Sequence, residues 1–102
     1  MLVVFTTAPN YEEANSLAAK IIENKLAACV QVLPQMTSHY FWEGAIRKEP
    51  EHLLLIKTME DKFDELEPFI KENHSYDVPE IVSIKAESVS AEYLSWLKDW
   101  LT

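Results

Sequence analysis

The hydrophobic positions in the first part of the chain change from the period of a strand to that of a helix. Residues 2–7 form a short β-rich apolar run that predicts a strand, and Pro9 follows its end. Asn10, with Glu13 three residues later, is typical of a helix N-terminus, where both side chains can cap free N–H groups. We predict a first helix that ends at Asn24 in the left-handed conformation. Its apolar stripe is Ala14, Leu17, Ala18, Ile21 and Ile22.

The next segment predicts the outward arm of a β-hairpin. Residues 26–33 have strand character, and the pattern resumes over residues 37–42. Between them, Pro34 cannot donate to a ladder, so it marks a bulge or an edge position. Glu43-Gly44 then predicts the turn, because glycine readily supplies a positive φ.

The return arm is predicted in two pieces. It starts at residues 45–47, is interrupted at Glu49-Pro50-Glu51, and continues as a strand over residues 52–58. The arms Leu26–Trp42 and Ile46–Thr58 both exceed the usual strand length of about five or six residues. Part of the hairpin should therefore project beyond the body of the protein.

The tip of this hairpin is aromatic on both faces. Tyr40, Phe41 and Trp42 are consecutive, and successive side chains of a strand point to opposite sides. Exposed aromatic strands invite pairing with another chain, so we expect an oligomer. The alternative is that the C-terminal helix covers this surface within the same chain.

The second half of the chain predicts a helix, a strand and a last helix. The first helix begins around Glu60 or Asp61, and Pro68 should kink it. A strand follows over residues 81–86, and Ser90 caps the last helix. The two apolar stripes are Phe63, Leu66, Phe69 and Ile70 in the first helix, and Tyr93, Trp96, Leu97, Trp100 and Leu101 in the last.

The predicted order is β-α-β-β-α-β with an extra C-terminal helix. Two split βαβ units of this kind make a ferredoxin-like α+β sandwich, in which the helices cover one face of the sheet and the long central hairpin joins the two halves. We find no internal repeat or linker, so we expect one domain over residues 1–102. A chain of this length buries about two-thirds of its unfolded surface without a disulfide or structural metal.

Charge and composition exclude several classes of function. The net charge of −8, from 17 acidic and 9 basic residues, opposes binding to nucleic acid and to anionic membranes. Gly44 is the only glycine, which excludes a glycine-rich phosphate loop. Cys29 is the only cysteine, which excludes an internal disulfide and fits a reducing compartment. The N-terminus lacks the basic region of a signal peptide, so we expect a cytoplasmic protein.

Five blocks of sequence closely resemble the CutA family, also called divalent-cation tolerance proteins. They are Lys25–Val30, Tyr40–Gly44 with Ile46, Ile56–Thr58, His74–Ile81 and Tyr93–Leu97. The resemblance implies a ferredoxin-like protomer, a very stable homotrimer built through the long hairpins, and a role in tolerance to copper and other divalent metals. The family has no established catalytic activity, so the resemblance implies none here. The family's trimer looks like that of the PII signalling proteins.

The chain departs from the family in places that matter for metal binding. It has His74-Ser75-Tyr76 where the family commonly has His-Pro-Tyr, and Gln31 where the family often has Asn. The copper site of some members uses a cysteine at the end of the first strand and two adjacent histidines. Here these positions are Thr6, Asn73 and His74, so one ligand of three remains.

The remaining candidate metal ligands each have an ordinary structural alternative. The Cys29 thiol suits soft ions such as Cu(I), but cysteine is also a common small buried side chain. His74 could cap the helix before it, or bind a metal with Glu80 or with Cys29 of a neighbouring subunit. His39 and His52 could form a cross-strand metal pair, or could simply be exposed.

Other residues in the family-like blocks predict a polar cleft between subunits. A lysine and a glutamate near aromatic rings suit a small ligand, or else an interfacial salt bridge. The predicted cleft residues are Tyr40, Trp42, Lys57, Tyr76 and Glu80. We find no catalytic triad, nucleophile elbow or metalloprotease motif, so an enzyme is not expected and no cofactor is required. The leading hypothesis is a trimer that binds copper or another divalent metal ion; the alternative is a PII-like scaffold that binds a metabolite or partner.

Overall fold

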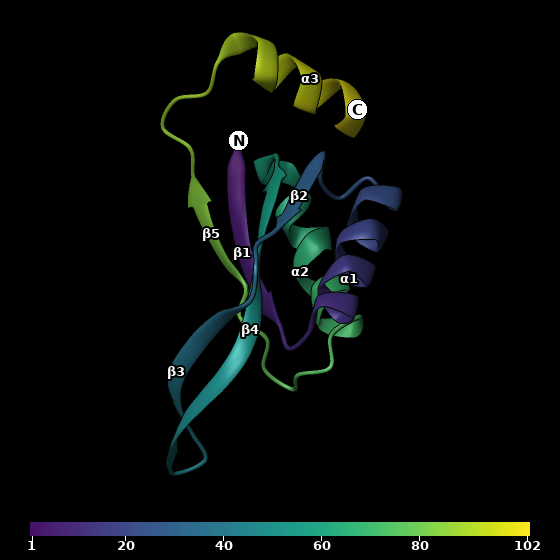
Figure 1. Ribbon diagram of the computed structural model, residues 1–102. Helices are drawn as coiled ribbons and strands as arrows, with labels where there is room; N and C mark the ends of the chain where they lie inside the picture. The colour runs from purple at the N-terminus through teal and green to yellow at the C-terminus, as the bar shows by residue number, and fades with distance from the viewer.

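One long strand, β4 (Ala45–Thr58), organises the sheet of this protein. The computed structural model describes residues 1–102, and in it β4 pairs antiparallel with three other strands (Figure 1). The main sheet has the order β2-β4-β1-β5, and β3 pairs with the outer part of β4. The other elements are β1 (Leu2–Ala8), α1 (Tyr11–Glu23), β2 (Cys29–Val32), β3 (Met36–Trp42), the 3-10 turn η1 (Glu60–Lys62), α2 (Phe63–Glu72), β5 (Val82–Lys85) and α3 (Ala91–Leu101).

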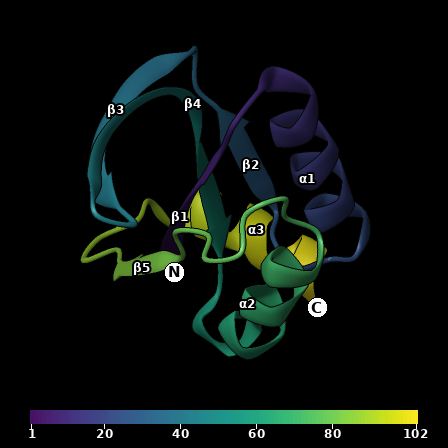
Figure 2. The ribbon, with the colours of Figure 1, turned by 90° about the horizontal axis from the view of Figure 1, so that it is seen from below.

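Helices α1 and α2 cover one face of this sheet, as the ferredoxin-like prediction requires. Figure 2 shows both helices on the same side, with the hairpin curling away from them. Alternate residues of β1 and β4 point into this layer, so Val4, Leu54 and Ile56 are fully buried. The helices contribute the predicted stripes, in which Leu17, Ile21, Leu66 and Ile70 are buried. The α+β, ferredoxin-like fold class is confirmed.

The outward arm of the hairpin is shorter than predicted and broken in two. Residues 26–28 lie outside any strand, and β2 and β3 are separated by residues 33–35. Val32 pairs with Leu54, and Met36 pairs with Glu51. Three residues on this arm therefore face two on β4, which makes the bulge predicted at Pro34.

The predicted interruption of the return arm is wrong. β4 runs without a break from residue 45 to 58 and includes Pro50. β1 ends at Ala8, opposite His52, so beyond this point one edge of β4 has no neighbouring strand. Because proline only removes a donor, it is tolerated where a strand edge is free. The turn is confirmed, and both Glu43 and Gly44 have positive φ angles there.

The helix ends follow the sequence signals with one correction. The Asn10 side chain accepts a hydrogen bond from the Glu13 N–H at 2.8 Å, as predicted. At the other end of α1, Asn24 has a φ of −89°, and Lys25 takes the left-handed conformation instead. The left-handed residue of such a cap lies one position beyond the last half-helical residue, which explains the shift.

Helix α3 does not cover the hairpin tip, so the intramolecular alternative is wrong. It lies at the end of the sheet opposite the hairpin (Figure 1). Ser90 caps it as predicted, but only Leu97 and Leu101 of its apolar face are buried. The hairpin thus projects freely, and the molecule measures 45 × 25 × 23 Å. Its radius of gyration of 14.2 Å exceeds the value of about 13 Å for a compact domain of this length.

Two buried threonines in the core allow a matched test of this packing. The Thr58 hydroxyl donates to the Leu26 carbonyl at 2.7 Å, whereas the Thr6 hydroxyl has no partner. Thr58→Val should lower the free energy of unfolding by about 1–3 kcal/mol, because it leaves a buried carbonyl unpaired. Thr6→Val should raise it by about 1 kcal/mol, because it removes an unsatisfied hydroxyl. Guanidinium unfolding at equal chain concentration measures both, and equal signs would contradict the packing.

Candidate functional site

A cleft of about 570 Å³ lies at the base of the hairpin. Its walls come from the end of β1, from β3 and β4, and from the loop at residues 75–80. By strand alternation, Thr7 and Glu51 belong to the sheet face that the helices leave uncovered. Its lining residues are Thr7, Ser38, His39, Tyr40, Trp42, Glu51, Ser75, Tyr76, Asp77, Val78 and Glu80.

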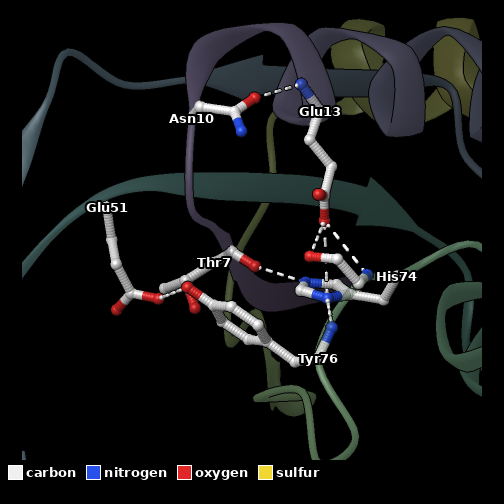
Figure 3. A network of polar contacts seen from close by, with 7 residues as sticks. Thr7, Asn10, Glu13, Glu51, His74 and Tyr76 are labelled. Atoms are coloured by element: carbon white, nitrogen blue, oxygen red, sulfur yellow. Dashed lines mark hydrogen bonds and ion pairs between the residues drawn. The ribbon is translucent and has the colours of Figure 1, made fainter.

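His74 ties the loop of the cleft to the sheet. Its side chain is fully buried, and its Nε2 lies 2.6 Å from the Thr7 carbonyl oxygen (Figure 3). Its Nδ1 accepts a hydrogen bond from the Tyr76 N–H at 3.0 Å. These two partners fix the neutral tautomer with the proton on Nε2. Both ring nitrogens are therefore occupied within the chain.

Helix α1 supports the same loop through Glu13. One carboxylate oxygen of Glu13 accepts hydrogen bonds from the Ser75 N–H at 3.2 Å and from the Ser75 hydroxyl at 2.9 Å (Figure 3). The same oxygen lies 3.6 Å from His74 Nδ1. The backbone N–H of Glu13 thus takes part in the helix cap, while its carboxylate anchors the loop. Serine, which replaces the family's common proline here, supplies both donors.

Tyr76 and Glu51 form the floor of the cleft. The Tyr76 hydroxyl donates to the Glu51 carboxylate at 2.8 Å (Figure 3). Burial and this hydrogen bond raise the pKa of Tyr76 well above its ordinary value, so it stays a neutral donor. Glu51 is only 8% exposed, and sequence reasoning missed it. Its signal was an acidic residue directly before the apolar run of β4, which we interpreted as a strand break.

Four of the five predicted cleft residues line this cleft within one chain: Tyr40, Trp42, Tyr76 and Glu80. Lys57 does not. It lies near the opposite end of the sheet, with its Nζ 5.6 Å from the centroid of the Tyr93 ring in α3. A single chain therefore does not form the predicted lysine–glutamate pair.

The predicted metal ligands are also separated in one chain. Cys29 pairs with Lys57 of β4. His74 contacts Thr7, which pairs with Leu53 of β4. Lys57 and Leu53 are four residues apart on that strand. Four residues of strand span about 13 Å. No group of three or more His, Cys, Asp or Glu side chains is placed to hold one ion. Whether Cys29 of a neighbouring subunit completes such a site stays a prediction.

Two positions that replace family copper ligands have structural roles instead. The Thr6 side chain is fully buried in the helix-covered core. The Asn73 amide donates to the Phe69 carbonyl at 2.9 Å, at the end of α2. Neither side chain is directed to a shared site with His74.

Of the two alternatives for His39 and His52, the cross-strand pair is wrong, and the exposed position holds for His39 alone. His39 pairs with Lys48, whereas His52 pairs with Ala8 and its Nδ1 lies 2.9 Å from the Leu33 carbonyl oxygen. His52 is also buried rather than exposed. The turn at Glu43-Gly44 sets the pairing of His39, because it places Trp42 opposite Ala45 and the ladder continues from there without a break.

Comparisons with known proteins agree with this architecture. The family described as CutA1 divalent ion tolerance protein matches residues 2–100. The divalent-cation tolerance protein CutA of Thermus thermophilus is 41% identical over 97 residues, which cover 95% of this chain and 94% of the relative. The chloroplastic protein CutA 1 of Oryza sativa is 45% identical over 96% of this chain, but over only 55% of the relative. The chain thus spans about half the length of the plant relatives.

Solved structures show the same fold. CutA1 from Pyrococcus horikoshii superposes with a TM-score of 0.95 at 35% identity, over 100% of this chain and 99% of that chain. CutA1 from Oryza sativa superposes with a TM-score of 0.96 at 44% identity, over 99% and 93% of the two chains. None of the helices of the present protein has the length and apolar composition needed to cross a membrane.

The Tyr76–Glu51 hydrogen bond can be tested by its pH dependence. Tyr76→Phe should lower the free energy of unfolding near pH 8, because it leaves a buried carboxylate without its donor. The raised pKa means that the folded chain keeps a proton that the unfolded chain releases above about pH 10. The stabilisation from Tyr76 is therefore complete below that pH and is lost as the pH rises further.

Chemical unfolding of the wild type and Tyr76→Phe between pH 8 and 11.5 provides the measurement. The difference in stability should shrink above about pH 10. Tyr11→Phe, at an exposed tyrosine, is the control and should show no such trend. A Tyr76→Phe difference that stays constant over the whole range would contradict the assignment.

Proposed function

The chain belongs to the CutA1 divalent ion tolerance protein family, and on this premise we propose that it acts as a homotrimer with ligand clefts between its subunits. The ligand is copper or another divalent metal ion, or a small molecule. This family is one of tolerance proteins and is not an enzyme family. No catalytic residue is therefore assigned.

The uncovered face of the sheet is the observation that supports assembly. Residues of β1, β4 and β5 place apolar side chains on it, among them Phe5 and Leu55. Val82 and Ile84 of β5 keep 50% and 54% of their surface exposed. A contiguous apolar face of this kind marks a protein contact in a chain that stays in solution.

The projecting hairpin supports the same proposal. Its outer part has no helix on either face, and the aromatic side chains at its tip remain exposed. Free strand edges promote open-ended association unless closed symmetry satisfies them. Three copies, the number that the family resemblance implies, close such a set of contacts.

The position of the cleft makes it a candidate for an inter-subunit site. It lies on the uncovered sheet face, beside the hairpin that assembly would bury. Lys57 and Cys29 lie at the other end of the sheet, so a neighbouring subunit would have to supply either of them to the cleft. A cleft completed in this way exists only in the oligomer.

A cytoplasmic location remains part of the proposal. The single cysteine fits a reducing compartment. The relatives vary, since the plant proteins are called chloroplastic and the Archaeoglobus fulgidus structure is called periplasmic.

The arrangement of His74 favours a second function in which no metal is physiological. Both of its ring nitrogens already have partners, so metal binding would break the loop that forms the cleft. We therefore propose, as the alternative, a PII-like scaffold that binds a metabolite or a partner protein.

Assembly is tested by the mass of the protein in solution. Light scattering after gel filtration should give the mass of three chains for the wild type. Ile84→Asp should reduce it, because it would bury a charge in the contact. Ser83→Asp, at the neighbouring β5 residue on the opposite face, should leave it unchanged. A wild-type monomer, or an Ile84→Asp trimer, would contradict the proposed interface.

Direct metal binding is tested by calorimetric titration of the reduced protein with Cu(I), Cu(II) and Zn(II). Sequestration requires a dissociation constant far below about 1 mM. Cys29→Ser should weaken Cu(I) binding at least tenfold if the thiol is a ligand, while Ser88→Ala, at an exposed residue outside the cleft, serves as the control. Binding no tighter than about millimolar would exclude sequestration and leave the small-ligand alternative.

A further inference from the structure

Glu51 is a buried acid without a cation. Glu51 is 8% exposed, and the only hydrogen bond that its carboxylate accepts comes from the neutral Tyr76 hydroxyl. The two lysine–glutamate ion pairs of the chain, Lys71–Glu67 and Lys85–Glu60, lie elsewhere, and the His74–Glu13 contact does not include Glu51. Buried carboxylates are normally paired with a positive charge, because removing them from water is costly. Glu51 lines the cleft, so the cleft is where a positive charge from outside the chain can reach it.

The rest of the cleft is built for the same sign of charge. Asp77 and Glu80 add two more carboxylates to its walls, and no lysine or arginine lines it. The whole chain carries a net charge of −8. An acidic cleft in an acidic protein concentrates cations from solution. The local charge therefore favours a positively charged ligand over an anionic metabolite.

Aromatic rings indicate that this cation has an organic body. Tyr40 and Trp42 line the cleft and keep 40% and 41% of their surface exposed. The faces of such rings attract ammonium groups and pack against methylene chains.

The spacing of the three carboxylates in the cleft argues against a single metal ion as the ligand. The three carboxylates are not gathered closely enough to hold one metal. They are spread over a cleft of about 570 Å³, which is the size of sites that enclose small organic molecules. Separate negative groups around one cleft match separate positive groups on one flexible molecule.

From this geometry we propose that the cleft binds a linear organic polyammonium ion, of the diamine or polyamine class. One primary ammonium pairs with Glu51, a second is held by Asp77 and Glu80, and the connecting methylenes lie against Tyr40 and Trp42. The inference deepens the small-ligand form of the proposed function and rests on its cleft, but it requires no metal.

Calorimetric titration of the full chain with spermidine and putrescine, in chelator and at physiological salt, tests the proposal. Both should bind with dissociation constants below about 1 mM and raise the melting temperature. Equal concentrations of 1,4-butanediol, which is neutral, and of succinate, which is anionic, should do neither. Mg²⁺ with chelator omitted should bind at least tenfold more weakly than spermidine, because it cannot use the rings.

Matched variants separate the cleft from the general acidity of the chain. Glu51→Gln should weaken spermidine binding at least tenfold, and it keeps an acceptor for the Tyr76 hydroxyl, so the fold is retained. Glu87→Gln changes the net charge equally at an exposed site outside the cleft and should leave binding unchanged.

Several outcomes would overturn the inference. Equal weakening by Glu51→Gln and Glu87→Gln would show a diffuse ion atmosphere. Absence of spermidine binding would overturn the inference. The positive charge opposite Glu51 would then have to come from another source, such as a basic residue of a neighbouring subunit. The proposed function fails separately: a trimer that binds copper but no polyamine overturns only this inference, whereas a monomer that binds spermidine overturns only the inter-subunit cleft.

Discussion

The structure depends on the continuous backbone pairing of β4. Its inner half lies between β1 and β2 and carries the side chains that α1 and α2 bury. Its outer half pairs with β3 alone and extends past every helix. One strand therefore belongs both to a closed core and to an open hairpin. Because β4 is one continuous paired strand, the packing of its inner half in the core also sets the direction of its outer half in the hairpin.

The cleft forms where these two halves of β4 meet. Glu51 is the last β4 residue paired with β3, and Thr7 is close to the end of β1. His74 binds the Thr7 carbonyl and holds the following loop against this boundary, while Glu13 supports the loop from α1. Three segments far apart in sequence thus meet at one point. The hydrogen bonds among them make the cleft a preformed feature of the fold.

Family membership, the uncovered sheet face and the cleft each bear on what this protein binds. The chain belongs to the CutA1 divalent ion tolerance protein family, and the apolar residues of β5 lie exposed on the uncovered sheet face. The geometry within one chain places no complete metal site, because His74 is engaged and Cys29 is distant. The proposed metal site would therefore need ligands from a second chain. The acidic, aromatic cleft offers a site for organic cations that needs no such assistance.

The sequence by itself determined the order of strands and helices, the caps at Asn10 and Ser90, the turn at Gly44 and the family, since each depends on neighbouring residues, but it misplaced strand limits in the hairpin. It also predicted four of the eleven residues that line the cleft, because Tyr40, Trp42, Tyr76 and Glu80 lie in the blocks that resemble the family. Only the tertiary structure decided that His52 lies opposite Ala8 and that the Tyr76 hydroxyl reaches a buried Glu51. The physical reason is that these contacts join segments far apart in sequence, so no pattern of neighbouring residues signals them, and the extra residue between β2 and β3 offsets the β2–β4 pairing by one from the β3–β4 pairing.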